Sequence, residues 1–453
     1  MFKFIHAADI HLDSPLQRLG QYDDAPADLL RSATRHALSN LVDLAIDEQV
    51  DFVVIAGDVY DGDWDDVRTG LVMVQQMARL RDARIPVFVI AGNHDAATKM
   101  THHVPLPDNV TMFGYRKPET KTLEHLSVAI HGQSFSKQAV TENLARNYPP
   151  AVPNMFNLGL LHTSLDGREG HANYAPCSLE DLRAKQYDYW ALGHIHQREQ
   201  LSERPWIGFS GNLQGRHVRE AGAKGALLVS VDDARASDVR VEVEFRELDV
   251  VRWERLELNA TDFAAAEELH EAARTQLESL RAQRADLSYA VRLEVTGETP
   301  FHDDYAGQSK KWEVELRGIA AATGGSRGQG ELWVEKIKFR THPPRRGGGE
   351  HELSDGPLAE VESLVAEYLS SDEALAELGK ELQDLRTKLP QELQQGGEPL
   401  LVDSPAFLRE RANELAPYLR EQLRRGGSAP LGGAPASSGS RGRKAADVGD
   451  ADA

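Results

Sequence analysis

Carboxylate and imidazole side chains follow the first two apolar segments of this 453-residue chain. Asp9 and His11 come after residues 2–8, and Asp58 follows residues 52–56 after a single glycine. On an extended backbone, the spacing D-x-H points both side chains to the same side, so Asp9 and His11 can bind one metal ion. An aspartate buried beside an apolar segment is costly unless it is paired or metal-bound. These residues therefore predict metal ligands, although a surface Asp–His pair and a helix N-cap at Asp58 are the structural alternatives.

The third apolar segment, residues 86–90, leads into the tetrapeptide Gly92-Asn93-His94-Asp95. Asn93 can offer its side-chain carbonyl oxygen to a metal ion, and the neighbouring His94 can act as a proton donor. Asp95 has two interpretations, because it can orient the His94 imidazole or cap a helix. In this context the tetrapeptide indicates a functional site more specifically than D-x-H does alone.

Three histidines follow two further apolar segments. His162 comes after residues 156–161, and a G-H-x-H motif with His194 and His196 comes after residues 189–192. This spacing again places two imidazoles on one side of an extended segment. Ligands of open α/β sheets gather at the carboxyl ends of strands. One metal site therefore explains all five segment ends together, whereas a structural interpretation must explain each of them separately.

The elements that must position these side chains alternate between strands and helices. Apolar residues at helical spacing predict amphipathic helices over residues 27–47 and 67–80, between the first apolar strands. Residues 225–231 and 239–248 alternate apolar with polar residues and are predicted to be antiparallel strands. This order predicts that residues 1–250 form a mixed α/β sandwich.

A smaller α+β cap domain is predicted at residues 251–340, where the composition changes. Its predicted elements are a strand, a helix and two further strands, over residues 251–258, 263–280, 289–295 and 332–339. In the second of these strands, Arg292 and Glu294 alternate with apolar residues, so one face of the strand is predicted to be buried.

The remainder of the chain is predicted to be a linker, a helical segment and a tail. Residues 341–356 are rich in Pro and Gly, residues 357–425 have helical periodicity, and residues 426–453 are Gly, Ala, Ser and Arg with little to bury. A Ser404-Pro405 pair supplies a helix N-cap and a first-turn proline. Spacings of 3, 4, 3 and 4 define an apolar seam formed by Leu375, Leu378, Leu382, Leu385 and Leu389. The helices form either an intramolecular hairpin or a docking element for a partner coiled coil.

The five motifs, in this order, resemble those of the calcineurin-like metallophosphoesterase superfamily: D-x-H, G-D-x-x-[DH], G-N-H-[DE], H and G-H-x-H. The resemblance covers roughly residues 1–220 and implies a two-sheet αββα sandwich. It implies that the first metal ion is bound by Asp9, His11 and His196. It implies that the second is bound by Asn93, His162 and His194. Asp58 would bridge the two ions, and His94 would be a catalytic histidine that binds neither.

A finer resemblance connects the chain to the DNA-repair exonucleases, namely SbcD-like nuclease subunits and their YhaO-like relatives. It rests on the opening HAADIHLDSPL, on FSGNLQGRHVREAG at residues 209–222 and on WVEKIKFRT from Trp333. It implies a manganese-dependent 3′–5′ DNA exonuclease that works with an SMC-like ATPase partner and can form a homodimer. Arg216 and His217, in the second of these segments, are predicted to bind substrate. Some nucleases of this branch have a histidine where this chain has Asp61, so no histidine role is assigned there.

The ligand set is consistent with this chemistry. Carboxylate, amide and imidazole ligands suit manganese, with iron or zinc as alternatives, and no thiolate contributes. Two such ions can hold a phosphodiester and lower the pKa of the attacking water. Asp95 is grouped with His94 as a catalytic residue.

Composition constrains the class of protein and its partners. The chain is 41 % hydrophobic and 27 % charged, has no apolar run of the roughly 18 residues that a membrane span needs, and begins without the pattern of a signal peptide. With a single cysteine, Cys177, it is predicted to be cytoplasmic. A net charge of −20 argues against nucleic-acid binding through bulk positive potential, although bound metals neutralise carboxylates and a partner can supply a basic surface.

Two alternatives to a nuclease stay open. A calcineurin-like phosphatase or small-nucleotide phosphodiesterase would use the same ligands, and the acidic charge favours it. A non-catalytic scaffold would bind DNA or a partner without hydrolysis, but it would be expected to have lost ligands, and the set is complete.

Overall fold

The computed structural model describes residues 1–14, 27–61, 67–97, 105–166, 174–232, 239–325, 330–344, 364, 369–388, 401–409 and 411–412. These residues separate into two compact units, one formed by residues up to 344 and the other by residues from 364 onward. Predictions for residues outside the described ranges are not tested by the structure. These include most of the linker, the larger part of the helical segment and the whole tail at 426–453. Among the described residues, no helix is long and apolar enough to cross a membrane.

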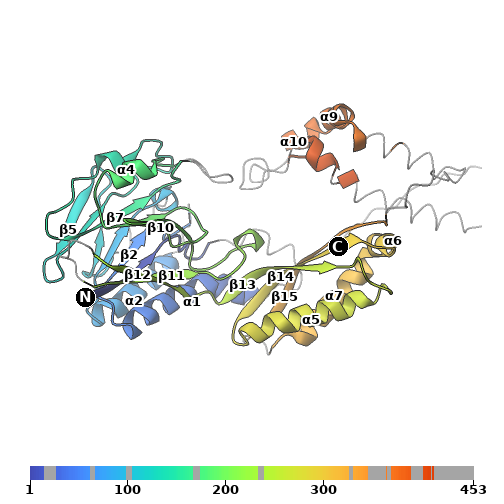
Figure 1. Ribbon diagram of the computed structural model, residues 1–453, viewed down its shortest axis with the longest axis horizontal. Coiled ribbons are helices and arrows are strands. Elements are labelled where there is room, and N and C mark those ends of the chain that lie inside the picture. Colours follow the sequence, from blue (N-terminus) through green and yellow to red (C-terminus); the bar gives the residue numbers. More distant parts are fainter. Residues whose placement is uncertain are drawn as a thin grey trace, which may run out of the picture. The chain divides into compact units, whose positions relative to one another are not determined.

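The first unit contains two six-stranded sheets packed face to face (Figure 1). The first sheet has the order β12-β11-β1-β2-β3-β4, with strands β1 (Phe2–Ala7), β2 (Phe52–Ala56), β3 (Val87–Ile90), β4 (Val110–Met112), β11 (Gly225–Val231) and β12 (Val241–Glu247). The second has the order β5-β6-β7-β8-β10-β9, with strands β5 (Glu119–Leu123), β6 (Val128–Gly132), β7 (Phe156–His162), β8 (Tyr189–Gly193), β9 (Glu199–Glu203) and β10 (Trp206–Phe209). Strands β1 to β4 are parallel, whereas β11 pairs antiparallel with β1 and β12, as the sequence predicts.

Strand alternation explains how one sheet contributes to two cores. In β1, Phe4 packs between the sheets against Phe52, with ring centroids 4.9 Å apart, while its neighbour Ile5 packs on the helix side. The helix side is covered by α1 (Ala27–Asp47) and α2 (Val67–Asp82). The outer face of the second sheet is covered by the short helices η3 (Leu144–Asn147) and α4 (Leu179–Arg183). The first 250 residues therefore form the expected αββα sandwich.

Five of these strands are not predicted from the sequence: β4, β5, β6, β9 and β10. Three of them, β4, β5 and β9, lie at sheet edges and are partly exposed, so they lack a continuous apolar run. The other two are fully buried but only five and four residues long.

A three-stranded parallel sheet follows, with its own apolar core. Its order is β13-β14-β15, and its elements are β13 (Val251–Asn259), α5 (Glu268–Gln283), β14 (Ser288–Glu298), α6 (His302–Gly307), α7 (Ser309–Thr323) and β15 (Leu332–His342). Helices α5 and α7 lie side by side (Figure 1) and contribute Leu277 and Trp312 to this core. The prediction of one helix in this region is wrong, because parallel strands need a crossover connection and β14 is joined to β15 through α6 and α7.

The second unit departs from the predicted leucine seam. Helix α9 (Asp372–Glu381) ends before Leu382, and α10 (Gln383–Lys388) is a separate turn. Leu375 is buried, but Leu378 and Leu385 are 38 % and 49 % exposed, so one continuous seam does not form among the described residues. The predicted N-cap at Ser404 is confirmed, since its hydroxyl accepts the Phe407 N–H at 3.2 Å.

Candidate metal centre

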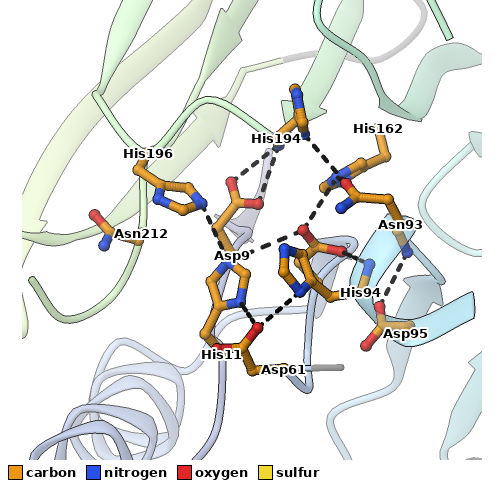
Figure 2. Close-up of polar contacts among 12 residues, drawn as sticks. Asp9, His11, Asp61, Asn93, His94, Asp95, His162, His194, His196 and Asn212 are labelled. Atoms are coloured by element: carbon orange, nitrogen blue, oxygen red, sulfur yellow. Dashed lines mark hydrogen bonds and ion pairs between the residues drawn. The ribbon is translucent and has the colours of Figure 1, made fainter. Parts of the chain in front are cut away.

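All the predicted metal ligands meet at the carboxyl ends of β1, β2, β3, β7 and β8 (Figure 2). His162 is the last residue of β7, and Asn93 is the first residue of helix α3 (Asn93–Ala97), which follows β3. Asp9 and Asp58 follow β1 and β2 within two residues of each strand end. The two sheets therefore supply the site jointly.

The first group consists of Asp9, His11 and His196, whose ligand atoms lie within 4.8 Å of one another. The Nε2 atoms of His11 and His196 face each other at 3.1 Å. The Asp9 carboxylate accepts the backbone N–H of His194 at 3.0 and 3.1 Å, which fixes its direction. Two imidazole nitrogens and a carboxylate at this separation can bind one cation together.

The second group consists of Asn93, His162 and His194. The Asn93 Oδ1 atom lies 3.0 Å from His162 Nε2 and 3.2 Å from His194 Nδ1. His162 Nδ1 lies 2.9 Å from the Ala56 carbonyl oxygen, to which it donates its proton, so its Nε2 lone pair faces the site. Asp58 Oδ2 lies between the groups, 3.3 Å from His162 Nε2 and 3.9 Å from His11 Nε2.

The backbone at four of these residues is left-handed. The φ angles of Asp9, His11 and Asp58 are 51°, 45° and 51°, and that of His194 is 102°. The loops are held by hydrogen bonds from the Asp9 and His11 N–H groups to the Gly57 and Asp58 carbonyls, both 3.0 Å. The expectation that D-x-H and G-H-x-H project from extended backbone is therefore wrong. Because the chain turns at His194, the His194 imidazole belongs to the second group and that of His196 to the first. Left-handed conformations of non-glycine residues cost about 1–3 kcal/mol each and concentrate at functional sites.

Burial and mutual charge set the ionisation of this site. Burial raises the pKa of Asp9 to about 6 and lowers that of His11 to about 3. Burial alone would raise the pKa of Asp58, but nearby His162 holds it well below its usual range, and Asp58 in turn raises the pKa of His162 to about 9 against the effect of burial. Burial therefore makes the charged form of Asp9 costly without a nearby cation, and it keeps His11 neutral, with a nitrogen lone pair that can bind one. The donor set therefore fits two divalent cations.

Gly193 allows the close packing of β8 against the end of β2. A Cβ atom at this position would lie 2.0 Å from the Ala56 carbonyl oxygen and 3.0 Å from His162 Nδ1. Because that carbonyl also holds His162, the absence of a side chain at Gly193 is part of the construction of the second group.

Substitution of Gly193 by alanine is expected to weaken the binding of one of the two manganese ions at least about tenfold. It is also expected to lower the free energy of unfolding by about 1–3 kcal/mol. The displaced Ala56 carbonyl would no longer fix the His162 ring. Manganese titration and urea unfolding would measure both effects. Gly318→Ala is the control, because a Cβ atom there would meet nothing within 4 Å. Unchanged affinity for both ions in Gly193→Ala would contradict this account.

His94 lies beside the two groups and is the most exposed imidazole of the site. Its side chain is 35 % exposed, whereas those of His11 and His162 are fully buried. Its Nδ1 atom lies 2.7 Å from Asp61 Oδ1 (Figure 2). Burial alone would lower the pKa of His94, but the hydrogen bond to Asp61 outweighs it and the pKa is raised. This geometry suits a proton donor that faces an incoming substrate.

Asp95 does not orient the His94 imidazole, as one interpretation of the tetrapeptide expected. Its buried carboxylate accepts the backbone N–H groups of Val59, Tyr60 and Gly92 at 3.2, 2.8 and 3.0 Å. It therefore ties together the loops that follow β2 and β3, while Asp61 bonds the imidazole. Because three backbone N–H groups donate to the Asp95 carboxylate, the interpretation that it orients the His94 imidazole is wrong, while its catalytic role stays a prediction.

The segment at residues 209–222 contributes Glu220, a second carboxylate that contacts an imidazole of the site, as Asp61 contacts His94. Sequence patterns do not single out Glu220. Glu220 Oε1 lies 2.7 Å from His196 Nδ1. Arg216 contacts Glu220 at 3.2 Å and Asp61 at 3.4 Å, and its side chain is 16 % exposed. Its predicted role in substrate binding stays a prediction. His217 is 53 % exposed and lies 3.7 Å from Glu220, so its predicted substrate role stays a prediction. A glutamate in a polar segment has no sequence signal until the fold brings it to a ligand.

Two family models and a relative that is 35 % identical place the chain in a family. Residues 2–198 match the family model of calcineurin-like phosphoesterases, and residues 253–342 match that of the middle domain of metallophosphoesterase YhaO. The chain is 35 % identical over 301 residues to YhaO of Bacillus subtilis, an uncharacterized metallophosphoesterase, with 66 % of this chain and 72 % of that protein covered. It is 27 % identical over 262 residues to the DNA double-strand break repair protein Mre11 of Sulfurisphaera tokodaii, covering 55 % and 65 %. A solved dimetal phosphatase from Danio rerio aligns with 11 % identity and a TM-score of 0.34, covering 55 % of this chain and 96 % of that one.

Proposed function

Because the chain belongs to the calcineurin-like metallophosphoesterases, in the branch that includes YhaO, we propose that it is a manganese-dependent DNA nuclease, acting as a 3′–5′ exonuclease. The coarser activity, metal-dependent phosphoester hydrolysis, follows from membership of the family and from the ligand groups. Manganese is proposed on the ligand chemistry, with iron or zinc as the alternatives.

The observation that carries the proposal is the position of Asp58 between two ligand groups, with His94 outside both. Asp9, His11 and His196 would hold one ion, and Asn93, His162 and His194 the other, with Asp58 shared. When bound, such ions stabilise charge on the phosphoryl oxygens and lower the pKa of the attacking water. His94 holds its Nδ1 proton toward Asp61, and its role in this proposal is to donate the Nε2 proton to the leaving oxygen.

Two features support DNA as the substrate. A relative described as a DNA double-strand break repair protein matches more than half of the chain. In the parallel sheet after residue 250, strand register aligns Arg255 with Arg292 and Arg292 with Lys336, which forms a basic row across three strands. Arg292 is paired with Glu335, but Arg255 and Lys336 are exposed. Phosphate groups of DNA bind such rows of cations.

A double substitution of Arg255 and Lys336 by alanine is expected to weaken DNA binding and to reduce the slope of log affinity against log salt by about 2, since each lost phosphate contact contributes roughly 0.9. Hydrolysis of bis-p-nitrophenyl phosphate should be unchanged, because neither residue belongs to the ligand groups. Fluorescence anisotropy at several salt concentrations measures the slope. Lys121→Ala, on the edge strand β5, is the control. An unchanged slope, or an equal loss on both substrates, would argue against this surface.

An SMC-like ATPase is proposed as the partner, with the helical segment as its docking element; a homodimer is proposed as well. A chain that ends at Pro344 retains all of β15 and removes the second unit. If the proposal holds, the full chain should copurify with an SMC-like ATPase encoded in the same genome and the shortened chain should not. Equal recovery with both chains would place docking elsewhere.

The acidic net charge of −20 favours a second candidate, a phosphatase or small-nucleotide phosphodiesterase that uses the same site. Purified protein with manganese should release nucleotides from the 3′ ends of labelled duplexes with defined termini. Absence of DNA cleavage together with rapid hydrolysis of a small phosphate ester would favour the second candidate. Binding of DNA without hydrolysis of either substrate would indicate the non-catalytic scaffold.

A further inference from the structure

We propose that Glu220 is a positioning residue, which holds His196 in the tautomer that binds a metal ion. The inference rests on the proposed metal-dependent function and extends it to a residue outside the ligand groups. His196 has its two ring nitrogens in different surroundings. Nε2 lies 3.1 Å from His11 Nε2 in the first ligand group, whereas Nδ1 lies 2.7 Å from Glu220 Oε1 on the opposite side.

The hydrogen bonds of Glu220 determine where the His196 proton must be. Glu220 Oε2 accepts the backbone N–H of Arg216 at 2.7 Å and a side-chain N–H of Asn212 at 3.0 Å. His196 Nδ1 lies 2.7 Å from Glu220 Oε1 and 3.2 Å from Arg216 Nη2. A carboxylate has no proton to donate, so the shorter of these contacts favours the proton on Nδ1. The Nε2 lone pair then faces the first ligand group, which is the arrangement that a carboxylate behind a metal-bound histidine provides.

Glu220 is held in place as part of a buried ion pair. Its side chain is 7 % exposed, and Arg216 Nη2 donates to Oε1 at 3.2 Å. Arg216 also reaches Asp61 Oδ2 at 3.4 Å, so the guanidinium neutralises the carboxylates behind His196 and behind His94. With its oxygens occupied by these donors, Glu220 acts behind His196 and does not compete as a ligand.

Replacement by glutamine gives a prediction that a purely structural role does not. The Arg216 backbone N–H and the Asn212 N–H both donate to Oε2, at 2.7 and 3.0 Å, whereas only Arg216 Nη2 donates to Oε1 besides His196, at 3.2 Å. The amide oxygen of Gln is therefore expected at the Oε2 position. The amide NH₂ group then points at His196 Nδ1 and favours the tautomer with the proton on Nε2, which cannot bind a cation. Replacement by alanine removes the carboxylate without adding an amide donor, and leaves Arg216 Nη2, 3.2 Å from Nδ1, as the longer contact of that nitrogen. Glu220→Gln should therefore impair metal binding more than Glu220→Ala, although Ala removes more contacts.

The test is a manganese titration of the full chain, in which electron paramagnetic resonance measures the concentration of free Mn²⁺. Wild type should bind two ions, and Glu220→Gln should bind one of them about 10- to 100-fold more weakly with the other unchanged. Glu220→Ala should show a smaller loss. Glu335→Gln is a matched control, because Glu335 and its partner Arg292 are 7 % and 17 % exposed against 7 % and 16 % for Glu220 and Arg216. Its manganese affinities should equal those of wild type.

Several outcomes would overturn the inference. Wild-type affinities in Glu220→Gln, or a loss in Glu220→Ala as large as that in Glu220→Gln, would reduce Glu220 to a structural residue. ¹⁵N-histidine spectra of the metal-free wild type give an answer without any variant, since a proton found on His196 Nε2 contradicts the proposal. Failure of the wild type to bind two ions would overturn the proposed function as well, which separates the two failures.

Discussion

Substitution of Asp58 by asparagine is expected to lower kcat/KM for phosphoester hydrolysis by at least about 10³-fold, equivalent to about 4 kcal/mol of lost transition-state stabilisation. Asp58 Oδ2 faces both ligand groups, at 3.3 Å from His162 and 3.9 Å from His11. An amide carries no charge and offers one oxygen, so it cannot serve both groups. The value of kcat/KM and the number of manganese ions bound per chain, measured on the same preparation, should both fall.

The matched control for this substitution is Asp188→Asn. The Asp188 carboxylate also accepts a backbone N–H, that of Asn157 at 2.7 Å, but it lies outside the ligand groups. This variant should keep its activity and two manganese ions even if its stability falls. Activity within tenfold of wild type in Asp58→Asn would contradict the shared role of Asp58.

Removal of the His94 imidazole is the second large expected effect. His94→Ala should lower kcat by about 10²- to 10⁴-fold, the range for loss of a general acid, while both manganese ions are retained. The geometry also allows His94 to be a metal ligand, because ligand atoms of His94, His11 and Asp58 lie within 4.8 Å of one another. Loss of one ion in His94→Ala would identify His94 as a ligand and contradict its separation from the metal groups.

The pH dependence provides an independent check on His94. The hydrogen bond that His94 donates to Asp61 raises the pKa of His94 against the effect of burial, so the imidazole keeps its proton to higher pH. If His94 donates that proton, activity falls as pH rises through its pKa. Asp61→Asn removes the negative charge, lowers the pKa of His94 and should therefore shift this alkaline fall to lower pH. A shift to higher pH, or none, would argue against proton donation by His94.

The ligands were predictable because their residue types stand at the ends of apolar strands. Asp58 and His162 illustrate this, since each follows a run whose only stable position is inside a sheet. The backbone conformation that orients these side chains was not predictable from the alternation of side chains along an extended strand. Asp9 and His194 are left-handed because hydrogen bonds to neighbouring loops hold them so, and those loops are distant in sequence.

The residues that hold the site's imidazoles in place are identified by contacts between segments distant in sequence, and sequence patterns give little indication of them. Asp61 and Asp95 are both acidic residues that follow a strand end, yet only Asp61 reaches the His94 imidazole. Glu220 meets His196 because the segment after β10 returns to the first ligand group. In the parallel sheet, α7 was missed although Trp312 and Leu316 are spaced for a helix, because strand direction cannot be read from strand composition.

The most direct test of the two-cation site is anomalous diffraction at the manganese edge from crystals of the full chain grown with Mn²⁺. Two peaks about 3.5–4 Å apart are expected. One should lie among Asp9, His11 and His196, the other among Asn93, His162 and His194, with Asp58 in contact with both. A single peak, or a second peak outside these groups, would show that this chain does not hold two metal ions shared through Asp58.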